Sequence, residues 1–256
     1  MRFPPNLRTT IGYMAAVVFG STAILMSVMN NKTSSQIREP IPTTHVVLIG
    51  ASIGQAWRLA EWPERVKAQN FTAESIPAWQ FDKTEVVDEV LMRPKRKFHP
   101  TRTYLRSLFL PSPRKPDIVI LKECSSYFPG DLKHYQRDIQ DWVNRLQQEQ
   151  ILVILATVVP VTKTRAEQSP GKQESLVRYN DWVREYAQQH GLGVLDLEAA
   201  LRTGDRERYL QDEYAIPDGS HLNPAAYAVL DKELQRLLVG IASKDAKQAP
   251  AMAVVQ

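Results

Sequence analysis

The hydrophobic positions along the chain predict strands that alternate with helices. Five short apolar runs are typical of buried strands. They are His45–Ile49, Phe71–Ile76, Asp117–Leu121, Ile151–Leu155 and Val194–Leu197. Within Asp131–Gln150, and again from Leu176 to Ala187, apolar residues recur every three or four positions, which indicates helices that bury one face.

This order of elements predicts one three-layer α/β/α domain with a parallel sheet, because strands that alternate with helices pair in parallel through right-handed crossovers. His190–Gly191 predicts the end of one helix. Asn223–Pro224 predicts the start of the last helix, with asparagine as N-cap, and this helix is expected to run to about Leu238. The domain is assigned to residues 45–242, and residues 243–256 are expected to be a disordered tail.

An uncharged apolar run, Thr10–Met29, precedes the domain and is long enough to cross a bilayer as a helix. Arg2 and Arg8 come before it, as at the positively charged start of an anchor or a secretion signal. No cleavage motif of small residues follows Met29, so residues 1–30 are interpreted as an uncleaved single-pass anchor. A cleaved signal peptide and a buried amphipathic helix are the alternatives. Residues 31–44, which are polar and contain two prolines, are interpreted as a linker.

Composition narrows the possible partners only slightly. A formal net charge of +4 makes no case for nucleic acid as a partner. Cys124 is the single cysteine, which excludes an internal disulfide, and the scattered histidines lack metal-ligand spacing, so neither a metal nor another cofactor is expected. The segment Arg93–Lys115 is basic and has no acidic residue. We interpret it as a surface loop near anionic headgroups, with a lid or a groove for an anionic polymer as the alternative.

Ligands of open parallel α/β sheets bind at the carboxyl ends of the strands. Three predicted segments meet this condition: Gly50–Gly54, Lys122–Gly130 and Ile216–Pro224. In the first, Ser52 is flanked by glycines that leave its hydroxyl exposed. A serine at this position is also a common helix N-cap, so Ser52 alone does not establish a nucleophile.

Asp218 and His221 give Ser52 a possible function. A serine nucleophile needs a base, and the base needs a carboxylate that orients it. Asp218 lies three residues before His221, close to the predicted start of the last helix, so it can bind one ring nitrogen and leave the other for a hydroxyl. A polar turn with a surface histidine is the alternative.

The chain resembles the SGNH/GDSL hydrolase superfamily from about Val46 to Leu238. The resemblance rests on Gly50–Ser52 after the first strand, on Asp218 and His221 followed by Leu222–Pro224 and Tyr227, and on Tyr179–Leu197. It implies a flavodoxin-like fold, in which Ser52 attacks an ester carbonyl, His221 acts as base and then as acid, and Asp218 orients His221.

The chain departs from the family pattern at the oxyanion hole, which binds the negatively charged oxygen of the reaction intermediate. No glycine occurs between Gly54 and Gly130, so the glycine of the family's second block is missing. In the third block, Cys124 and Ser126 stand where the family has glycine and asparagine. The resemblance leaves Ser52, Cys124 and Ser126 as candidate oxyanion or substrate contacts. Beside them, Glu123 is interpreted as a substrate contact or as a salt-bridge partner of Lys122.

These observations predict a serine esterase or deacylase that cleaves an O-acyl ester of a small molecule, lipid or glycan at the cell envelope. An O-acyl transferase of the same fold and a catalytically inactive anchored binding domain are the alternatives. The positive start of the chain and the usual setting of anchored family members favour a periplasmic or extracytoplasmic domain. The sequence does not predict the oligomeric state.

Overall fold

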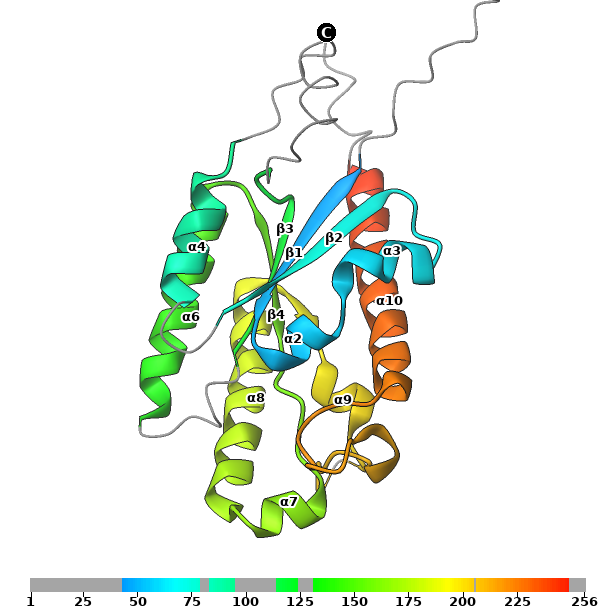
Figure 1. Ribbon diagram of the computed structural model, residues 1–256. Helices are drawn as coiled ribbons and strands as arrows, with labels where there is room; N and C mark the ends of the chain where they lie inside the picture. The colour runs from blue at the N-terminus through cyan, green and yellow to red at the C-terminus, as the bar shows by residue number, and fades with distance from the viewer. Residues whose placement is uncertain (1–42, 79–82, 95–113, 124–130, 205, 249–256) are drawn as a thin grey trace, which may run out of the picture. The chain divides into compact units, whose positions relative to one another are not determined.

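Five parallel strands form a sheet in the order β2-β1-β3-β4-β5, as in flavodoxin-like folds (Figure 1). This computed structural model describes residues 43–78, 83–94, 114–123, 131–204 and 206–248. The strands are β1 (Thr44–Gly50), β2 (Phe71–Pro77), β3 (Ile118–Lys122), β4 (Leu152–Ala156) and β5 (Gly193–Leu195). All five predicted strands are confirmed, with small shifts at their ends.

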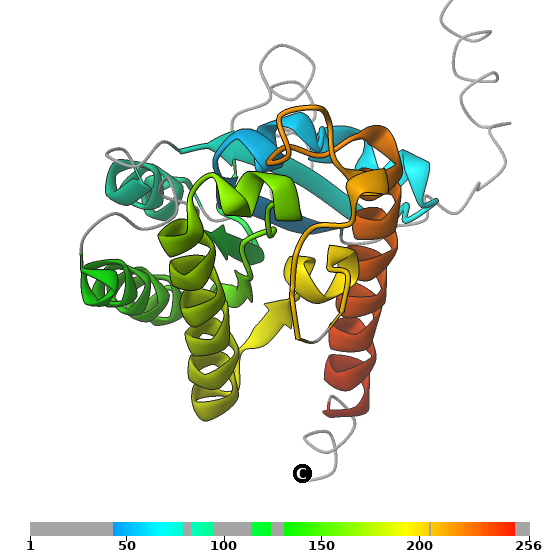
Figure 2. The same ribbon diagram turned by 90° about the horizontal axis from the view of Figure 1, so that it is seen from below.

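Helices cover both faces of the sheet, which confirms the three-layer prediction (Figure 2). One face packs against α4 (Lys83–Met92), α6 (Leu132–Gln148) and α8 (Pro170–His190). The other packs against α2 (Ser52–Ala56), the 3-10 helix η1 (Leu59–Glu61), α3 (Trp62–Arg65), α9 (Leu197–Leu201) and α10 (Pro224–Gln248). Side chains of a strand alternate between the faces, so Val46 and Leu48 enter one core while Val47 and Ile49 enter the other.

Two predicted boundaries are wrong. The fifth strand ends at Leu195, because the side chain of Asp196 accepts a hydrogen bond from the Ala199 N–H and caps α9. The last helix continues past Leu238 to Gln248, so residues 243–248 of the expected disordered tail are helical. The added turns contain good helix formers, and Ile241 packs against the core.

Several predictions concern residues outside the described ranges. These are the anchor over residues 1–30, nearly all of the linker, most of the basic segment Arg93–Lys115, the candidate contacts Cys124 and Ser126, and residues 249–256 of the tail. Among the helices that are described, none has the length and apolar character of a membrane span.

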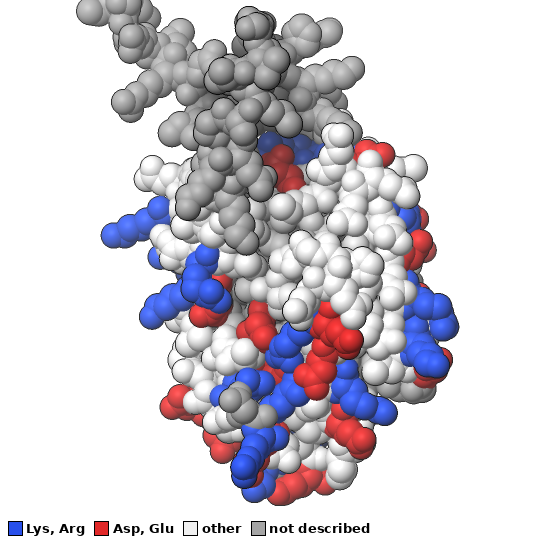
Figure 3. All heavy atoms as spheres, turned by 180° about the vertical axis from the view of Figure 1, so that it is seen from behind, with Lys and Arg blue, Asp and Glu red and all other residues white. Residues whose placement is uncertain are grey.

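Buried ion pairs connect elements that are distant in sequence. The fully buried carboxylate of Glu198 on α9 accepts hydrogen bonds at 2.6 Å from Arg184 of α8 and at 2.6 Å from Arg208. Leu210 then donates its N–H to the Val161 carbonyl, so this network fixes the loop after α9 to the segment after β4. Basic and acidic side chains are also interleaved over the lower part of the face seen in Figure 3.

Asp231 holds α10 against the first helices of the domain. Its buried carboxylate accepts hydrogen bonds from Trp57 Nε1 at 2.7 Å and from Arg65 at 2.7 and 2.8 Å. Trp62 Nε1 donates to the backbone carbonyl of the same residue at 3.2 Å. This cluster fixes the start of α10 relative to the segment that follows β1.

We predict that Asp231→Ala lowers the free energy of unfolding by about 2–4 kcal/mol, because it leaves Trp57 and Arg65 without their buried acceptor. Urea unfolding followed by far-UV circular dichroism measures the change. Glu233→Ala is the matched control, since Glu233 pairs with the largely exposed Arg236 and should cost at most about 1 kcal/mol. Equal losses for the two variants would contradict this account of Asp231.

Candidate active site

Ser52 lies where β1 ends and α2 begins, on the side of the sheet formed by the carboxyl ends of the strands (the carboxyl edge). It is the first residue of α2, and Ala51 is the N-cap, so Ser52 does not act as the cap itself. Two hydrogen bonds support this turn from other elements. Ser75 Oγ donates to the Gly54 carbonyl at 2.8 Å, and Tyr227 OH on α10 donates to the Ile53 carbonyl at 3.3 Å. Burial raises the pKa of Tyr227 to about 12, which keeps its hydroxyl a donor.

His221 reaches the same edge from a tight turn before α10. The His221 carbonyl accepts a hydrogen bond from Ile216 N at 3.0 Å, and Leu222 pairs with Ala215. Asn223 Oδ1 then accepts hydrogen bonds from Ala225 N and Ala226 N, which confirms it as the N-cap of α10. Seen from the carboxyl edge, this turn lies beside α2 (Figure 2).

The structure brings the three predicted residues Ser52, His221 and Asp218 into one hydrogen-bonded line. His221 Nε2 lies 3.1 Å from Ser52 Oγ, and His221 Nδ1 lies 2.5 Å from Asp218 Oδ2. Since a carboxylate only accepts, the proton belongs on Nδ1, and Nε2 is left to accept the serine proton. This is the order of groups that a serine nucleophile requires.

Asp218 is held as a carboxylate. Partial burial raises its pKa, but hydrogen bonds from the Ser220 N–H, the His221 ring and the His221 N–H outweigh that effect and lower the pKa to about 2. The two backbone contacts are 2.8 and 2.9 Å long. Asp218 and His221 side chains are 43% and 44% exposed, so the site is open to water.

The turn that carries Asp218 is supported by the segment after β4. Thr162 N donates to the Gly219 carbonyl at 2.9 Å, next to α7 (Lys163–Glu167). That segment is fixed by Asn180 of α8, which is fully buried and bonds both the N–H and the carbonyl of Val158, at 2.7 and 2.8 Å. Asn180 and Thr162 were not singled out from the sequence, because an isolated polar residue in a helix or loop carries no signal of its partner.

One interpretation of the segment after β3 is wrong. Glu123 forms an ion pair with Lys83 of α4, not with Lys122. Lys122 follows Ile118 and Ile120 to one face of the sheet, whereas Lys83, the partner of Glu123, lies on α4, which covers the opposite face. Among the described residues, no group of three or more His, Cys, Asp or Glu side chains is arranged to hold a metal.

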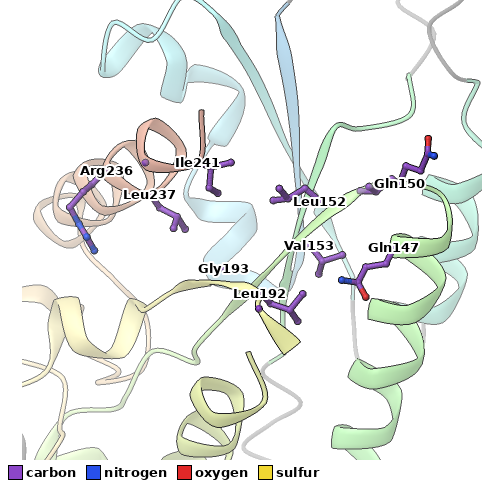
Figure 4. A pocket seen from close by; sticks show the side chains of 12 residues that line it. Gln147, Gln150, Leu152, Val153, Leu192, Gly193, Arg236, Leu237 and Ile241 are labelled. Carbon is purple, nitrogen blue, oxygen red and sulfur yellow. The ribbon is translucent and has the colours of Figure 1, made fainter. Parts of the chain in front are cut away.

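A pocket of about 700 Å³ lies at the amino ends of the strands, away from Ser52 (Figure 4). It is lined by residues at the amino ends of β4 and β5, at the end of α6 and on α10, including Leu152, Leu192, Gly193 and Leu237. It contains none of the candidate site residues.

Comparison with solved structures shows the same fold in bacterial hydrolases. A GDSL-like lipase from Bacteroides thetaiotaomicron aligns with a TM-score of 0.55 and 14% identity over 77% of this chain and 90% of its own. A lipase/acylhydrolase from Enterococcus faecalis gives 0.53 and 19% over 77% and 96%. An acetyl xylan esterase gives 0.53 and 16% over 75% and 98%. Comparison with curated proteins gave no match.

These structural likenesses show that the chain has the fold of those hydrolases. The model of the GDSL-like Lipase/Acylhydrolase family matches residues 48–229, which span β1 to α10. The chain belongs to this family, and it is an ester-hydrolysing enzyme by class.

Gly219 has φ of +71°, and a Cβ there would lie 2.5 Å from Thr162 Oγ1 and 2.9 Å from Arg165 Cβ. We therefore predict that Gly219→Ala displaces the turn, lowers stability by about 1–3 kcal/mol and reduces the rate of ester hydrolysis. Thermal unfolding and initial rates measure both effects. Gly171→Ala is the control, since a Cβ there meets nothing within 4 Å. An unchanged Gly219→Ala enzyme would contradict the assigned packing.

The contacts of Asp218 predict its titration. Its contribution to stability should be complete above the unfolded pKa near 3.8 and lost as the pH falls through about 2. In ¹³C NMR its carboxyl signal should titrate near pH 2, and His221→Ala should raise that midpoint because the ring hydrogen bond is gone. A wild-type midpoint near 3.8 would show that the hydrogen bonds to Asp218 are not formed.

Proposed function

We propose that the protein is a serine esterase or deacylase that cleaves O-acyl esters through Ser52, His221 and Asp218. The observation that carries the proposal is the continuous line from Ser52 Oγ through His221 to the Asp218 carboxylate, with contacts of 3.1 and 2.5 Å. These residues come from opposite ends of the domain, and a surface histidine has no structural need for this alignment.

In the proposed reaction, Ser52 Oγ attacks the ester carbonyl carbon while its proton moves to His221 Nε2. The carbonyl oxygen becomes negatively charged in the tetrahedral intermediate. His221 then returns the proton to the leaving alcohol oxygen, and the C–O ester bond breaks to leave an acyl group on Ser52. Water, activated by His221, releases the carboxylic acid and restores the serine.

Asp218 keeps the Nδ1 proton of His221 in place during these steps and stabilises the imidazolium that forms twice. A pKa of about 2 keeps Asp218 ionised at neutral pH. The Ser52 N–H is the proposed oxyanion donor, because the first N–H groups of a helix have no partner within the helix. Cys124 and Ser126 remain candidate contacts for the same oxygen.

The proposed substrates are acylated small molecules, lipids or glycans, and the exposed edge at Asp218 and His221 suits a large substrate. An acetyl xylan esterase shares this fold, which favours a short acyl group on a glycan as the first substrate class to test. The run Thr10–Met29 supports attachment to a membrane and action at the cell envelope. An O-acyl transferase would share every step up to the acyl-enzyme, and the openness of the site to water favours hydrolysis.

We predict that the purified full chain hydrolyses p-nitrophenyl acetate, and that Ser52→Ala and His221→Ala each lower kcat by at least about 10³-fold. Release of p-nitrophenol is followed by absorbance. Ser243→Ala and His134→Ala change the same residue types at exposed positions on α10 and α6 and should leave the rate unchanged. Wild type no faster than Ser52→Ala would exclude hydrolysis of this ester. A product found on an added glycan acceptor would then identify a transferase.

A further inference from the structure

Lys122, the last residue of β3, is buried beside the proposed site, and none of the described residues accepts a hydrogen bond from its amine. Its side chain is 2% exposed. Its Nζ has no hydrogen-bond partner among the residues that the structure describes. A lysine amine is positively charged in neutral water, and moving it into the protein without a partner opposes folding. A buried amine without a hydrogen-bond acceptor lowers the stability of the folded protein, so a role in the site would explain its presence.

Lys122 lies on the same face of the sheet as Ser52. Ile118 and Ile120 of β3 enter the core beneath α2 and α10, and the alternation of side chains directs Lys122 to that face too. The Lys122 side chain crosses Gly50, two residues before Ser52: its Cβ and Cδ lie 3.5 and 3.8 Å from where a Cβ of Gly50 would be. The lysine stem therefore lies directly against the turn that carries the serine.

Within the described ranges of the chain, no carboxylate bonds the amine of Lys122. Glu123, which follows β3, pairs with Lys83 of α4, and α4 covers the opposite face of the sheet. The register neighbour of Lys122 on β4 is Ala156, and its neighbour on β1 is Gly50, so neither supplies a polar side chain. The two buried lysines at this edge thus differ, because Lys83 has a carboxylate partner and Lys122 has none in the described part of the chain.

We propose that the charge of Lys122, buried beneath the Ser52 turn, stabilises the negative oxygen of the tetrahedral intermediate in the ester reaction. The inference rests on the proposed function of Ser52. A fixed charge in a water-excluded place acts more strongly than one in solvent and needs no rearrangement during the reaction.

The test compares kcat, KM and thermal stability of the full chain with those of Lys122→Met, which keeps the length of the side chain and removes its charge. We expect kcat to fall about 10- to 100-fold while KM stays within about threefold, since the charge acts on the intermediate and not on the bound ester. Thermal stability should be unchanged or higher, because an apolar group replaces an unpaired buried charge. Lys122→Arg, which keeps the charge, should retain more of the wild-type kcat.

Lys83→Met is the matched control for stability, and it should lower the melting temperature because it removes the ion pair that Lys83 forms with the buried Glu123 carboxylate. A Lys122→Met enzyme with wild-type kcat, or one whose kcat and melting temperature fall together, overturns the inference. So does a Lys122→Arg variant as slow as Lys122→Met. If wild type is active and Ser52→Ala is not, these outcomes leave the proposed function intact. Wild type no faster than Ser52→Ala overturns the proposed function and the role of Lys122 with it.

Discussion

The attachment of α10 to the helices after β1 is the constraint on which the site depends. Ser52 and His221 are far apart in sequence, and their 3.1 Å contact requires that the turn before α10 meet the end of β1. The buried Asp231 carboxylate fixes α10 through Trp57 and Arg65, and Tyr227 of the same helix bonds the carbonyl next to Ser52. One packed interface thereby positions both Ser52 and His221.

A second set of contacts sets the orientation of the histidine. Asn180 fixes the segment after β4, Thr162 of that segment bonds Gly219, and Asp218 next to Gly219 bonds the imidazole. Asn180 and Thr162 are buried, whereas Asp218 and His221 stay partly open to solvent. Asp218 and His221 are therefore held by buried contacts while their own side chains stay accessible to solvent.

Much of the fold was predictable because short apolar strands and amphipathic helices leave strong periodic patterns. Ser52, Asp218 and His221 could be predicted as a set because the motifs around them resemble the SGNH/GDSL pattern. The spacing of Asp218 and His221 alone left a polar turn with a surface histidine as the alternative. The partners of Glu123 and Asp231 were not, since ion pairs across the fold leave no spacing in the sequence. The predicted end of β5 is too late because Asp196, which caps α9, directly follows the apolar strand. The predicted end of α10 is too early because the last turns of this helix are only weakly apolar and resemble a disordered tail.

The central claim is that Ser52 is a nucleophile activated by His221. It is tested most directly by treating the full chain with a fluorophosphonate, which reacts with activated serines, and locating the adduct by peptide mass spectrometry. Our account predicts a single adduct on Ser52 that forms rapidly in wild type and is almost absent in His221→Ala. An adduct on another serine, or equal labelling of Ser52 with and without His221, would contradict it.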